Sequence, residues 1–407
     1  MSEAAAEPRF RDILRIPEIR AAMLGTFVIM LGYGILLPVL PNYARSFGVS
    51  LDAVGVLIAA FPLTRLMLDP IVGRLIARYG ERSMATLGAA GIGASAALAA
   101  VAPTFPLLVL FRGLGGAGSA LFFAALLSFL LRTTKPDRVG RVMGVYYASF
   151  NVGFIAGQPF GGPVARAFGL ASPFWLYAAS CVVAAWIFHR TITDGPPRGE
   201  DDARHVSLRR LPWGRQFAAA LVANGAYLWL TGALFGLLLP LFARERVGLS
   251  LRDIGIPLAV ATATEFAVLF PAGRASDRRG RRAVLVPALG GYAVLTATLG
   301  FADTPVTFFV ALAALGVASG YAGVPPAPML SDVTPEGMNG PAVAAFRFVG
   351  DLGFFLGPVV AGWAASRWGF GPAFAVTAAP AVVALLLVLA VPETRPVVPR
   401  TGEAPGL

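Results

Sequence analysis

The sequence predicts an all-α membrane protein with twelve transmembrane helices in two pseudo-symmetric bundles of six. Hydrophobic residues make up 57% of the 407 residues, and charged residues make up only 14%. Soluble domains contain about 25% charged residues, so this composition indicates a protein that lies in a lipid bilayer. The mean hydropathy of +0.71 agrees. Two further observations support the fold class: long apolar segments recur along the chain, and one basic stretch occurs twice.

Each helix is predicted from an apolar segment of about 20 residues, the length that spans a bilayer. The first bundle, 20–191, is expected to contain helices at 20–43, 52–75, 84–102, 105–131, 140–165 and 173–190. The second bundle, 216–392, is expected to contain helices at 216–243, 253–273, 283–302, 305–331, 340–365 and 371–391. Residues 1–19 are polar and basic and do not resemble a cleaved signal peptide. They are expected in the cytoplasm, together with a flexible linker at 192–215 and a tail at 393–407.

The distribution of basic residues predicts the orientation in the membrane. Most of the 33 Lys and Arg residues fall in the N-terminus, the loops after even-numbered helices and the C-terminus. This is the positive-inside pattern, which places both termini in the cytoplasm. The net charge of +11 is therefore attributed to topology and to contact with anionic lipid, and no nucleic-acid partner is expected.

The duplicated basic stretch predicts the two-bundle architecture. It begins at Gly73 and again at Gly273, and reads Gly-Arg-Leu-Ile-Ala-Arg-Tyr-Gly-Glu-Arg and then Gly-Arg-Ala-Ser-Asp-Arg-Arg-Gly-Arg-Arg. The same offset relates three glycines of the fifth helix to three of the eleventh: Gly153, Gly157 and Gly162 match Gly353, Gly357 and Gly362. Two related bundles around a midplane site are typical of secondary transporters, in which one half rocks against the other.

Rare residues exclude several kinds of chemistry. Lys135 is the only lysine and Pro136 follows it, so the chain has no Gly-Lys-Ser/Thr phosphate loop for ATP. A single cysteine, Cys181, excludes an internal disulfide and a multi-cysteine metal cluster. His189 and His205 lie at a helix end and in the linker, too few for a metal site. We therefore expect neither an enzyme, nor a metal, nor a cofactor, and the proton gradient is the expected energy source.

The duplicated stretch resembles the helix 2–3 signature of the major facilitator superfamily, Gly-x-x-x-Asp-Arg/Lys-x-Gly-Arg-Arg/Lys. The second copy fits it fully, whereas the first has Ala77 in place of the acid and Glu81 in place of a base. In that family the acid helps to latch the cytoplasmic gate. The resemblance therefore assigns to a cytoplasmic gate Gly73, Arg74, Arg78, Gly80, Arg82, Gly273, Asp277, Arg278, Gly280, Arg281 and Arg282.

The fourth and fifth helices are similar to the drug–proton antiporters of the superfamily. Leu108, Arg112, Gly116 and Gly118 follow the family's helix 4 signature, with Gly115 in place of glutamine. The helix 5 signature is present except that Pro159 lies one place late. Small residues allow close helix packing, and the same residues serve a hinge between the halves, so both roles stay open. The residues concerned are Gly153, Gly157, Pro159, Gly161, Gly162, Gly353, Gly357 and Pro358.

Six ionisable residues fall inside the apolar segments: Arg65, Asp69, Arg112, Glu265, Arg347 and Asp351. A charge at the bilayer centre costs about 2.5–3.5 kcal/mol, so each is expected to face protein or water. Two Arg/Asp pairs have i,i+4 spacing, which puts each pair on one helix face. Since the resemblance places helices 2 and 11 side by side, a charge network between the halves is predicted. Two local ion pairs are the alternative.

Glu265 and Arg112 are the strongest candidates for proton coupling, with Asp69 and Asp351 beside them. Glu265 has no local partner in its helix, and desolvation disfavours its charged form. It is expected to carry a proton, to anchor a cationic substrate, or to hydrogen-bond Tyr147 or Asn151 of helix 5. Arg112 matches the arginine that the family uses in proton coupling. In the loop after helix 10, Asp332 and Glu336 are expected to pair with Arg74, Arg78 or Arg82.

The resemblance implies a substrate cavity lined by helices 1, 4, 7 and 10, which supply aromatic residues and no acid. With neighbouring candidates from helix 5, the expected lining comprises Tyr33, Asn42, Phe122, Phe123, Tyr147, Asn151, Tyr227, Trp229, Phe235 and Tyr321. Such a lining favours hydrophobic or amphipathic molecules, with cations held over ring faces. Proton-coupled efflux of drug-like compounds by a monomer in a bacterial plasma membrane is the leading hypothesis. The alternatives are a single-solute metabolite carrier and, less favoured, a non-transporting sensor.

Overall fold

The computed structural model describes residues 16–135, 138–194, 211, 213–335 and 338–395, and this part of the chain is helical without strands. Most of the expected N-terminal segment, most of the central linker and most of the tail lie outside the described residues. The first half contains α2 (Pro17–Leu36), α3 (Leu40–Arg45), α4 (Leu51–Tyr79), α5 (Glu81–Ala100), α6 (Phe105–Thr133), α7 (Val139–Phe168) and α8 (Ser172–Thr191).

The second half repeats this order of helices. It contains α9 (Arg215–Ala233), the π-helical turn η4 (Leu234–Leu238), α10 (Leu239–Glu245), α11 (Gly255–Arg279) and α12 (Arg281–Thr298). The short 3₁₀ turn η5 (Leu299–Phe301), α13 (Pro305–Gly323), α14 (Pro326–Val333), α15 (Asn339–Trp368) and α16 (Phe370–Leu389) complete it.

Three of the helices that were expected to be continuous are interrupted. The first breaks between Leu36 and Leu40, the seventh passes through a π-helical turn, and the tenth breaks between Gly323 and Pro326. Proline explains two of these breaks, because Pro38 and Pro325 lack the amide hydrogen that continues a helix. Broken helices of this kind are tolerated in a membrane where they are buried in protein or line a cavity.

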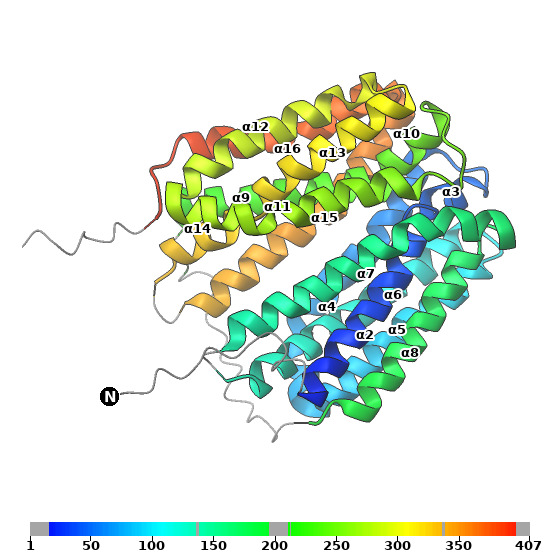
Figure 1. The fold of residues 1–407 in the computed structure, drawn as a ribbon. Helices are drawn as coiled ribbons and strands as arrows, with labels where there is room; N and C mark the ends of the chain where they lie inside the picture. Colours follow the sequence, from blue (N-terminus) through cyan, green and yellow to red (C-terminus); the bar gives the residue numbers. More distant parts are fainter. Residues whose placement is uncertain (1–15, 136–137, 195–210, 212, 336–337, 396–407) are drawn as a thin grey trace, which may run out of the picture.

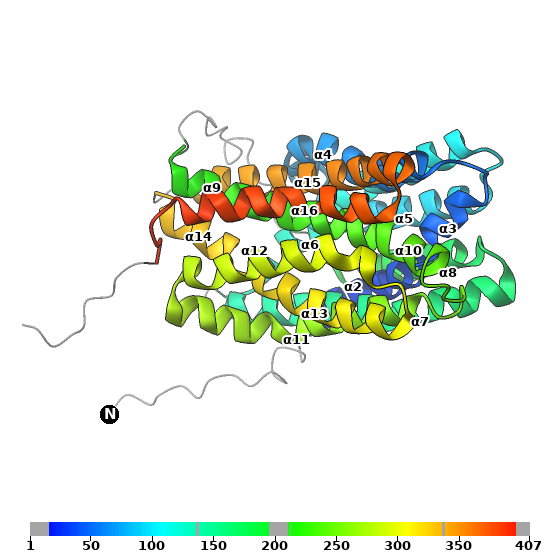
Figure 2. The same cartoon turned by 90° about the horizontal axis from the view of Figure 1, so that it is seen from above.

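The two halves meet along two seams. Helix α4 packs against α15, and α7 packs against α11. Figure 2 shows these two seams on opposite sides of the molecule. Helices α5, α8, α12 and α16 pack within their own halves, away from the seams (Figure 1), where the resemblance places the lipid-facing helices.

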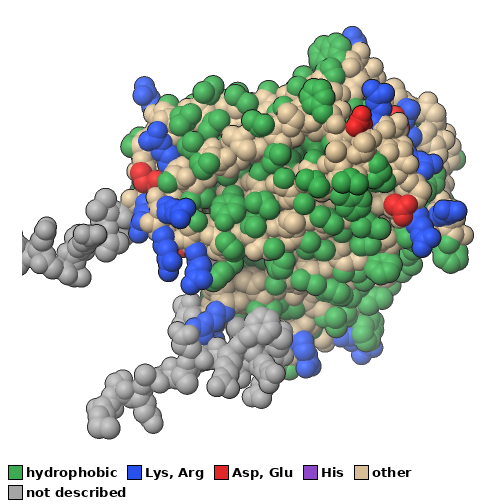
Figure 3. All heavy atoms as spheres, turned by 45° about the horizontal axis from the view of Figure 1, so that its top comes forward, with side chains coloured by type: hydrophobic (Ala, Val, Ile, Leu, Met, Phe, Trp, Pro, Cys, Tyr) green, Lys and Arg blue, Asp and Glu red, His purple; other side chains and the backbone are tan. Residues whose placement is uncertain are grey.

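Eleven described helical segments are long and apolar enough to cross a membrane. The remaining expected span, α7, is a 30-residue helix and is long enough, but its mean hydropathy is lower than that of the other spans. Its sequence explains the difference, because Asn151, Gln158 and several glycines dilute its hydropathy. On the face drawn in Figure 3, hydrophobic side chains cover the middle and Lys and Arg side chains gather toward the two ends. The chain is an integral membrane protein with an all-α fold.

Close glycine contacts hold each half together. A Cβ added at Gly157 of α7 would lie 2.2 Å from the carbonyl oxygen of Leu31 in α2. A Cβ added at Gly357 of α15 would lie 2.4 Å from the carbonyl oxygen of Trp229 in α9. Gly153, Gly161 and Gly353 make similar contacts within their own halves. For these glycines the structure favours close packing of neighbouring helices inside one bundle over a hinge between the bundles.

Other glycines close the molecule at one end. We call the end that carries Pro17, Thr191, Arg215 and Leu389 the terminus end, and the end that carries α3 and α10 the far end. Near the far end, a Cβ at Gly162 would lie 1.9 Å from the carbonyl oxygen of Leu251 in the other half. Gly362 makes the equivalent contact with the carbonyl oxygen of Leu51, at 2.7 Å.

The terminus end lacks comparable contacts. A Cβ added at Gly73 or Gly273, the first glycine of each basic stretch, would meet nothing within 4 Å. At the far end, by contrast, Arg45 forms an ion pair of 3.6 Å with Glu245 across the halves. Helices α7 and α11 accordingly approach each other toward the far end and diverge toward the terminus end (Figure 1). The halves are closed at the far end and separated at the terminus end.

Candidate functional site

A cavity lies between the two halves. The first half lines it with Tyr33, Leu37, Leu40, Ile58, Phe61, Pro62, Arg112, Phe150 and Phe154. The second half contributes Thr231, Phe235, Gly236, Thr262, Glu265 and Phe354. The broken segments α2–α3 and α9–η4 both reach this cavity. Its walls are therefore largely aromatic and aliphatic, with one arginine and one carboxylate among them.

Arg112 reaches the cavity from α6 and lies against aromatic rings. Its guanidinium carbon is 4.1 Å from the centre of the Phe61 ring and 6.0 Å from that of Tyr33. Gly116, one turn further along α6, brings α4 close, because a Cβ there would lie 1.9 Å from the carbonyl oxygen of Phe61. Arg112 is only 5% exposed, and its Nε has no hydrogen-bond partner. Gly116 thus allows the close approach of α6 and α4 that holds Arg112 over the ring of Phe61. A cation in this position is attracted to the π electrons of the ring.

Glu265 reaches the same cavity from α11 of the other half. Its Oε1 accepts a hydrogen bond of 2.5 Å from the hydroxyl of Tyr227 in α9. The expected contact of Glu265 with Tyr147 or Asn151 is not formed, since Asn151 donates to the carbonyl oxygen of Tyr147 instead. Tyr147 is 56% exposed. The sequence had no signal for the Tyr227 contact, because spacing within one helix does not show which residue of the neighbouring helix faces Glu265.

The four charges that were expected on the second and eleventh transmembrane helices lie together at the seam between α4 and α15, which are these two helices. Arg65 forms an ion pair with Asp351, and the Nη2 of Arg347 lies 3.9 Å from the Oδ2 of Asp69. Both pairs cross from one half to the other, so the alternative of two separate pairs within single helices is wrong. The predicted grouping of the four residues is present, and its part in transport stays a prediction.

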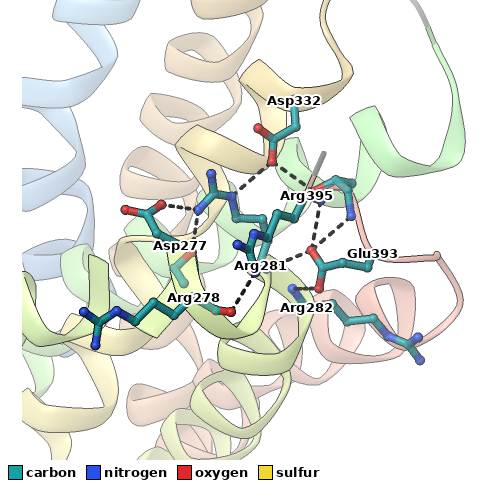
Figure 4. Close-up of polar contacts among 9 residues, drawn as sticks. Asp277, Arg278, Arg281, Arg282, Asp332, Glu393 and Arg395 are labelled. Carbon is teal, nitrogen blue, oxygen red and sulfur yellow. Dashed lines mark hydrogen bonds and ion pairs between the residues drawn. The ribbon is translucent and has the colours of Figure 1, made fainter. Parts of the chain in front are cut away.

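At the terminus end of the second half, the basic stretch contacts Asp332 and Glu393 from outside it and contains a third acid, Asp277 (Figure 4). The Nε of Arg281 lies 3.0 Å from the Oδ2 of Asp332 at the end of α14, and Arg281 also pairs with Asp277. Glu393, beyond α16, accepts hydrogen bonds from the backbone N–H groups of Arg281 and Arg282 at 2.8 and 3.0 Å. Burial alone would raise the pKa of Glu393, but donation by four backbone N–H groups lowers it below the usual value.

The first half contains the same arrangement with its charges exchanged. Glu81 accepts from Arg132 at the end of α6, with 2.8 Å between Oε2 and Nε. Positions 81 and 132 correspond to 281 and 332 through the offset of 200, so an acid–base pair in one half is a base–acid pair in the other. Asp194 accepts from the backbone N–H of Arg82 at 2.8 Å and takes the place of Glu393.

The glycine before each capped helix has a backbone that favours glycine. Gly80 has φ +83° and Gly280 has φ +102°. A Cβ at Gly80 would also lie 2.3 Å from a carboxylate oxygen of Asp194. These two signature glycines are therefore required both by the turn and by the carboxylate that closes it.

Comparison with known proteins identifies the family. A family model described as Major Facilitator Superfamily matches residues 22–264 and 228–406. The chain belongs to the major facilitator superfamily.

Curated members of the superfamily resemble this chain over much of its length. Multidrug resistance protein 1 of Bacillus subtilis (strain 168) is 27% identical over 350 residues, which cover 83% of this chain and 86% of that protein. Quinolone resistance protein NorA of Staphylococcus aureus (strain MSSA476) is 25% identical over 236 residues, which cover 57% of this chain and 60% of NorA.

Solved transporters of the superfamily share the fold. A bacterial homologue of the human lysosomal transporter Spinster, in an inward-facing and occupied conformation, matches with a TM-score of 0.77 and 16% identity, covering 95% of this chain and 97% of that one. The nucleoside transporter NupG matches with a TM-score of 0.73 and 14% identity, covering 92% of this chain and 98% of that one.

Several expected gate contacts of the superfamily are absent from the described part of this chain. Asp332 pairs with Arg281 of its own half, not with Arg74, Arg78 or Arg82, and Glu336 lies outside the described residues. Arg78 lies over the ring of Tyr79, at 5.3 Å. Arg278 contributes its backbone carbonyl oxygen, which accepts from Arg395 at 2.6 Å. The separation of the halves at the terminus end accounts for this, because the basic stretches face no partner helix there.

The cavity differs from the lining expected for the superfamily. Of the predicted residues, Tyr33 and Phe235 line it. Phe122 is fully buried inside the first half, where its ring stacks on Phe188 at 5.5 Å. The others do not line this cavity either: Asn42, Phe123, Tyr147, Asn151, Tyr227, Trp229 and Tyr321. The expectation of a lining without acids is wrong, because α11 of the second half brings Glu265 into the wall of the cavity that also contains Arg112.

Proposed function

We propose that this chain is a proton-coupled efflux transporter of hydrophobic or amphipathic drug-like compounds that works by alternating access. One observation carries the proposal: an aromatic cavity between the halves holds both Arg112 and Glu265. Largely apolar walls with a few polar groups that converge on one space are typical of small-molecule sites. The names of the related Bacillus and Staphylococcus proteins support the same class of substrate.

The direction of transport follows from the orientation that we propose. The positive-inside pattern supports a cytoplasmic position for the terminus end. The halves are separated at that end, so the cavity would take up its substrate from the cytoplasm and release it after the halves rock over to open the far end. No cofactor is invoked, and a monomer suffices because both halves come from one chain.

The energy source that we propose is the proton gradient. Moving one charge across the membrane yields about 2.3 kcal/mol per 100 mV, enough to drive useful accumulation without ATP. Glu265 is the proposed proton carrier, and Asp69 and Asp351 are further candidates at the seam. A carboxylate that takes up a proton in one conformation and releases it in the other links that gradient to substrate movement.

A susceptibility panel tests the proposed function. Cells that lack their own efflux pumps are grown with lipophilic compounds, with and without this protein, and cellular accumulation is measured before and after a protonophore is added. We expect higher tolerance to several compounds and lower accumulation that the protonophore reverses. Tolerance to no compound would contradict drug efflux and favour a carrier of one metabolite. Tolerance that survives the protonophore would contradict proton coupling.

A further inference from the structure

The cavity contains two opposite charges that the protein does not pair with each other. Arg112 of the first half makes no ion pair and no hydrogen bond among the described residues. Glu265 of the second half has an acceptor contact with the neutral hydroxyl of Tyr227 and, within the described chain, no basic partner. Each charge therefore faces the same space from a different half of the molecule.

The other charges inside the membrane are arranged differently. Arg65 is paired with Asp351, and Arg347 lies beside Asp69, at the seam between α4 and α15. A buried ion without a partner is strongly unfavourable, because no attraction to an opposite charge offsets the free energy lost when the ion leaves water. The charges at the seam have partners of opposite sign, whereas Arg112 and Glu265 in the cavity have no such partner among the described residues. Ionisable residues within a membrane are rare and mark substrate pathways, proton relays or the counter-ions of ligands.

We propose that the preferred substrates are zwitterions, with an anionic group bound at Arg112, a cationic group bound at Glu265 and an aromatic body between them. This inference rests on the proposed function and narrows its substrate class. The rings of Phe61, Phe150 and Phe154 line the same cavity as the two charges. A monocation would leave Arg112 unpaired and add a like charge to its surroundings, and a monoanion would do the same at Glu265.

A zwitterion would also connect the two halves. Arg112 belongs to α6 and Glu265 to α11, so one bound molecule with both charges contacts both bundles. A ligand shifts a conformational equilibrium only through different interactions with the two states. A substrate that contacts both halves has such a difference. When the halves move apart, Arg112 and Glu265 separate, and at least one of the two ionic contacts of the substrate becomes longer.

Binding of three matched fluorescent probes to the purified full-length protein in detergent tests the inference. Rhodamine 110 is an aromatic zwitterion, its methyl ester rhodamine 123 is a monocation, and fluorescein is an anion of nearly the same shape. We expect rhodamine 110 to bind about tenfold more tightly than rhodamine 123, since one charge-assisted contact is lost in the ester. Equal or tighter binding of the ester would overturn the proposal.

Variants assign the two charges. Arg112→Gln is expected to remove the preference for rhodamine 110 over its ester, whereas Arg112→Lys retains part of it. Glu265→Gln is expected to weaken both rhodamines by about tenfold and to spare fluorescein. Arg166→Gln, a change of the same kind at the exposed end of α7, is the control and should bind as the wild type does.

Two outcomes separate this inference from its alternatives. If Arg112→Gln and Arg112→Lys weaken all three probes alike, Arg112 only supports the fold and the proposal fails. If any variant does not purify as a folded protein, the wild-type comparison of the three probes still decides. Failure of the drug-efflux experiment together with a retained preference for rhodamine 110 would refute efflux and leave the binding chemistry intact.

Discussion

Glu81 shows how one residue can look like a loss in the sequence and be compensated in the structure. The basic stretch of the second half has Arg281 at this position, so an acid in the first half departs from the pattern. Arg132 supplies the missing base at the end of α6, and Ser128 donates to the other carboxylate oxygen at 2.6 Å. The terminus end of each half therefore keeps one ion pair between its basic stretch and its fourth helix.

Charge exchange at this pair gives a prediction at the scale of single residues. Glu81 is buried, so Arg132→Glu leaves two acids facing each other and is expected to lower stability by about 3 kcal/mol or less, since Arg132 is partly exposed. The double variant Glu81→Arg/Arg132→Glu copies the arrangement of the second half and should recover most of this loss. Thermal unfolding in detergent measures both. A double variant no more stable than the single one would contradict the pairing.

Glu265 gives the second prediction at this scale. Glu265→Gln keeps the shape of the side chain and its ability to accept from Tyr227, but it cannot release a proton. We expect this variant to lose substrate movement driven by a pH gradient and to retain exchange of substrate at equal pH on both sides. Proteoliposomes with an imposed gradient measure the two activities separately. Gradient-driven transport at the wild-type rate would show that the proton is carried elsewhere.

At the scale of elements, glycines of one helix divide into those that touch a neighbour and those that do not. In α7, a Cβ at Gly157 would lie 2.2 Å from a backbone oxygen of α2, whereas a Cβ at Gly144 would meet nothing within 4 Å. Backbone atoms cannot move aside as the end of a flexible side chain can. The first glycine is therefore a contact between two helices, and the second is free of such a constraint.

The comparison of these two glycines is the third prediction. Gly157→Ala is expected to destabilise the protein by about 1–3 kcal/mol through overpacking of α7 on α2. Gly144→Ala should be neutral or slightly stabilising, since alanine favours helix by up to about 1 kcal/mol. Melting temperatures of the two purified variants in the same detergent check this. Equal effects of the two substitutions would mean that the close approach of α7 and α2 does not constrain position 157.

The positions of the helices could be predicted from the sequence because bilayer thickness sets the length of each apolar segment. The interruptions in the first, seventh and tenth helices could not be placed in the same way. Pro38 and Pro325 are visible in the sequence, but proline within α4, at Pro62 and Pro70, leaves that helix continuous. Whether a proline breaks a membrane helix depends on neighbours that supply its missing contacts, and this is a property of the packed bundle.

The candidate site could be predicted only in part, for a related reason. Spacing within one helix placed the charges of the second and eleventh transmembrane helices on the right faces, and the family resemblance placed those two helices side by side. Spacing carries no information about partners on other helices, so the contact of Glu265 with Tyr227 and the burial of Phe122 against Phe188 were missed. The Glu81–Arg132 pair had a signal, since positions 81 and 132 both differ in sign from 281 and 332.

At the scale of the whole molecule, the seam between α4 and α15 contains the charges best placed to respond to movement of the halves. Both of its ion pairs cross from one half to the other, so any rocking about this seam changes their distances. The longer contact, 3.9 Å between Arg347 and Asp69, is partly exposed, whereas Asp351 is buried. We therefore expect the Arg347–Asp69 pair to be remade more readily than the Arg65–Asp351 pair.

Charge reversal across the seam is the fourth prediction. Arg347→Asp places an acid against Asp69 and is expected to lower the transport rate by at least about tenfold. A tenfold change corresponds to about 1.4 kcal/mol in the free energy of one conformational step. The double variant Asp69→Arg/Arg347→Asp restores opposite charges across the halves and should recover transport. Initial rates in proteoliposomes with equal protein incorporation provide the measurement. Unchanged transport in the single variant would remove the seam from the transport cycle.

The exchanged pair at 81 and 132 also bears on how the gene could have changed after it doubled. Reversal of the charge at one position alone joins two like charges, so a half that exchanges its acid and its base one at a time passes through a weakened intermediate. We expect a transplanted segment that contains only one member of the pair to bring two like charges together, whereas a segment that contains both members keeps the pair intact. The two residues of the pair lie 51 positions apart in each half.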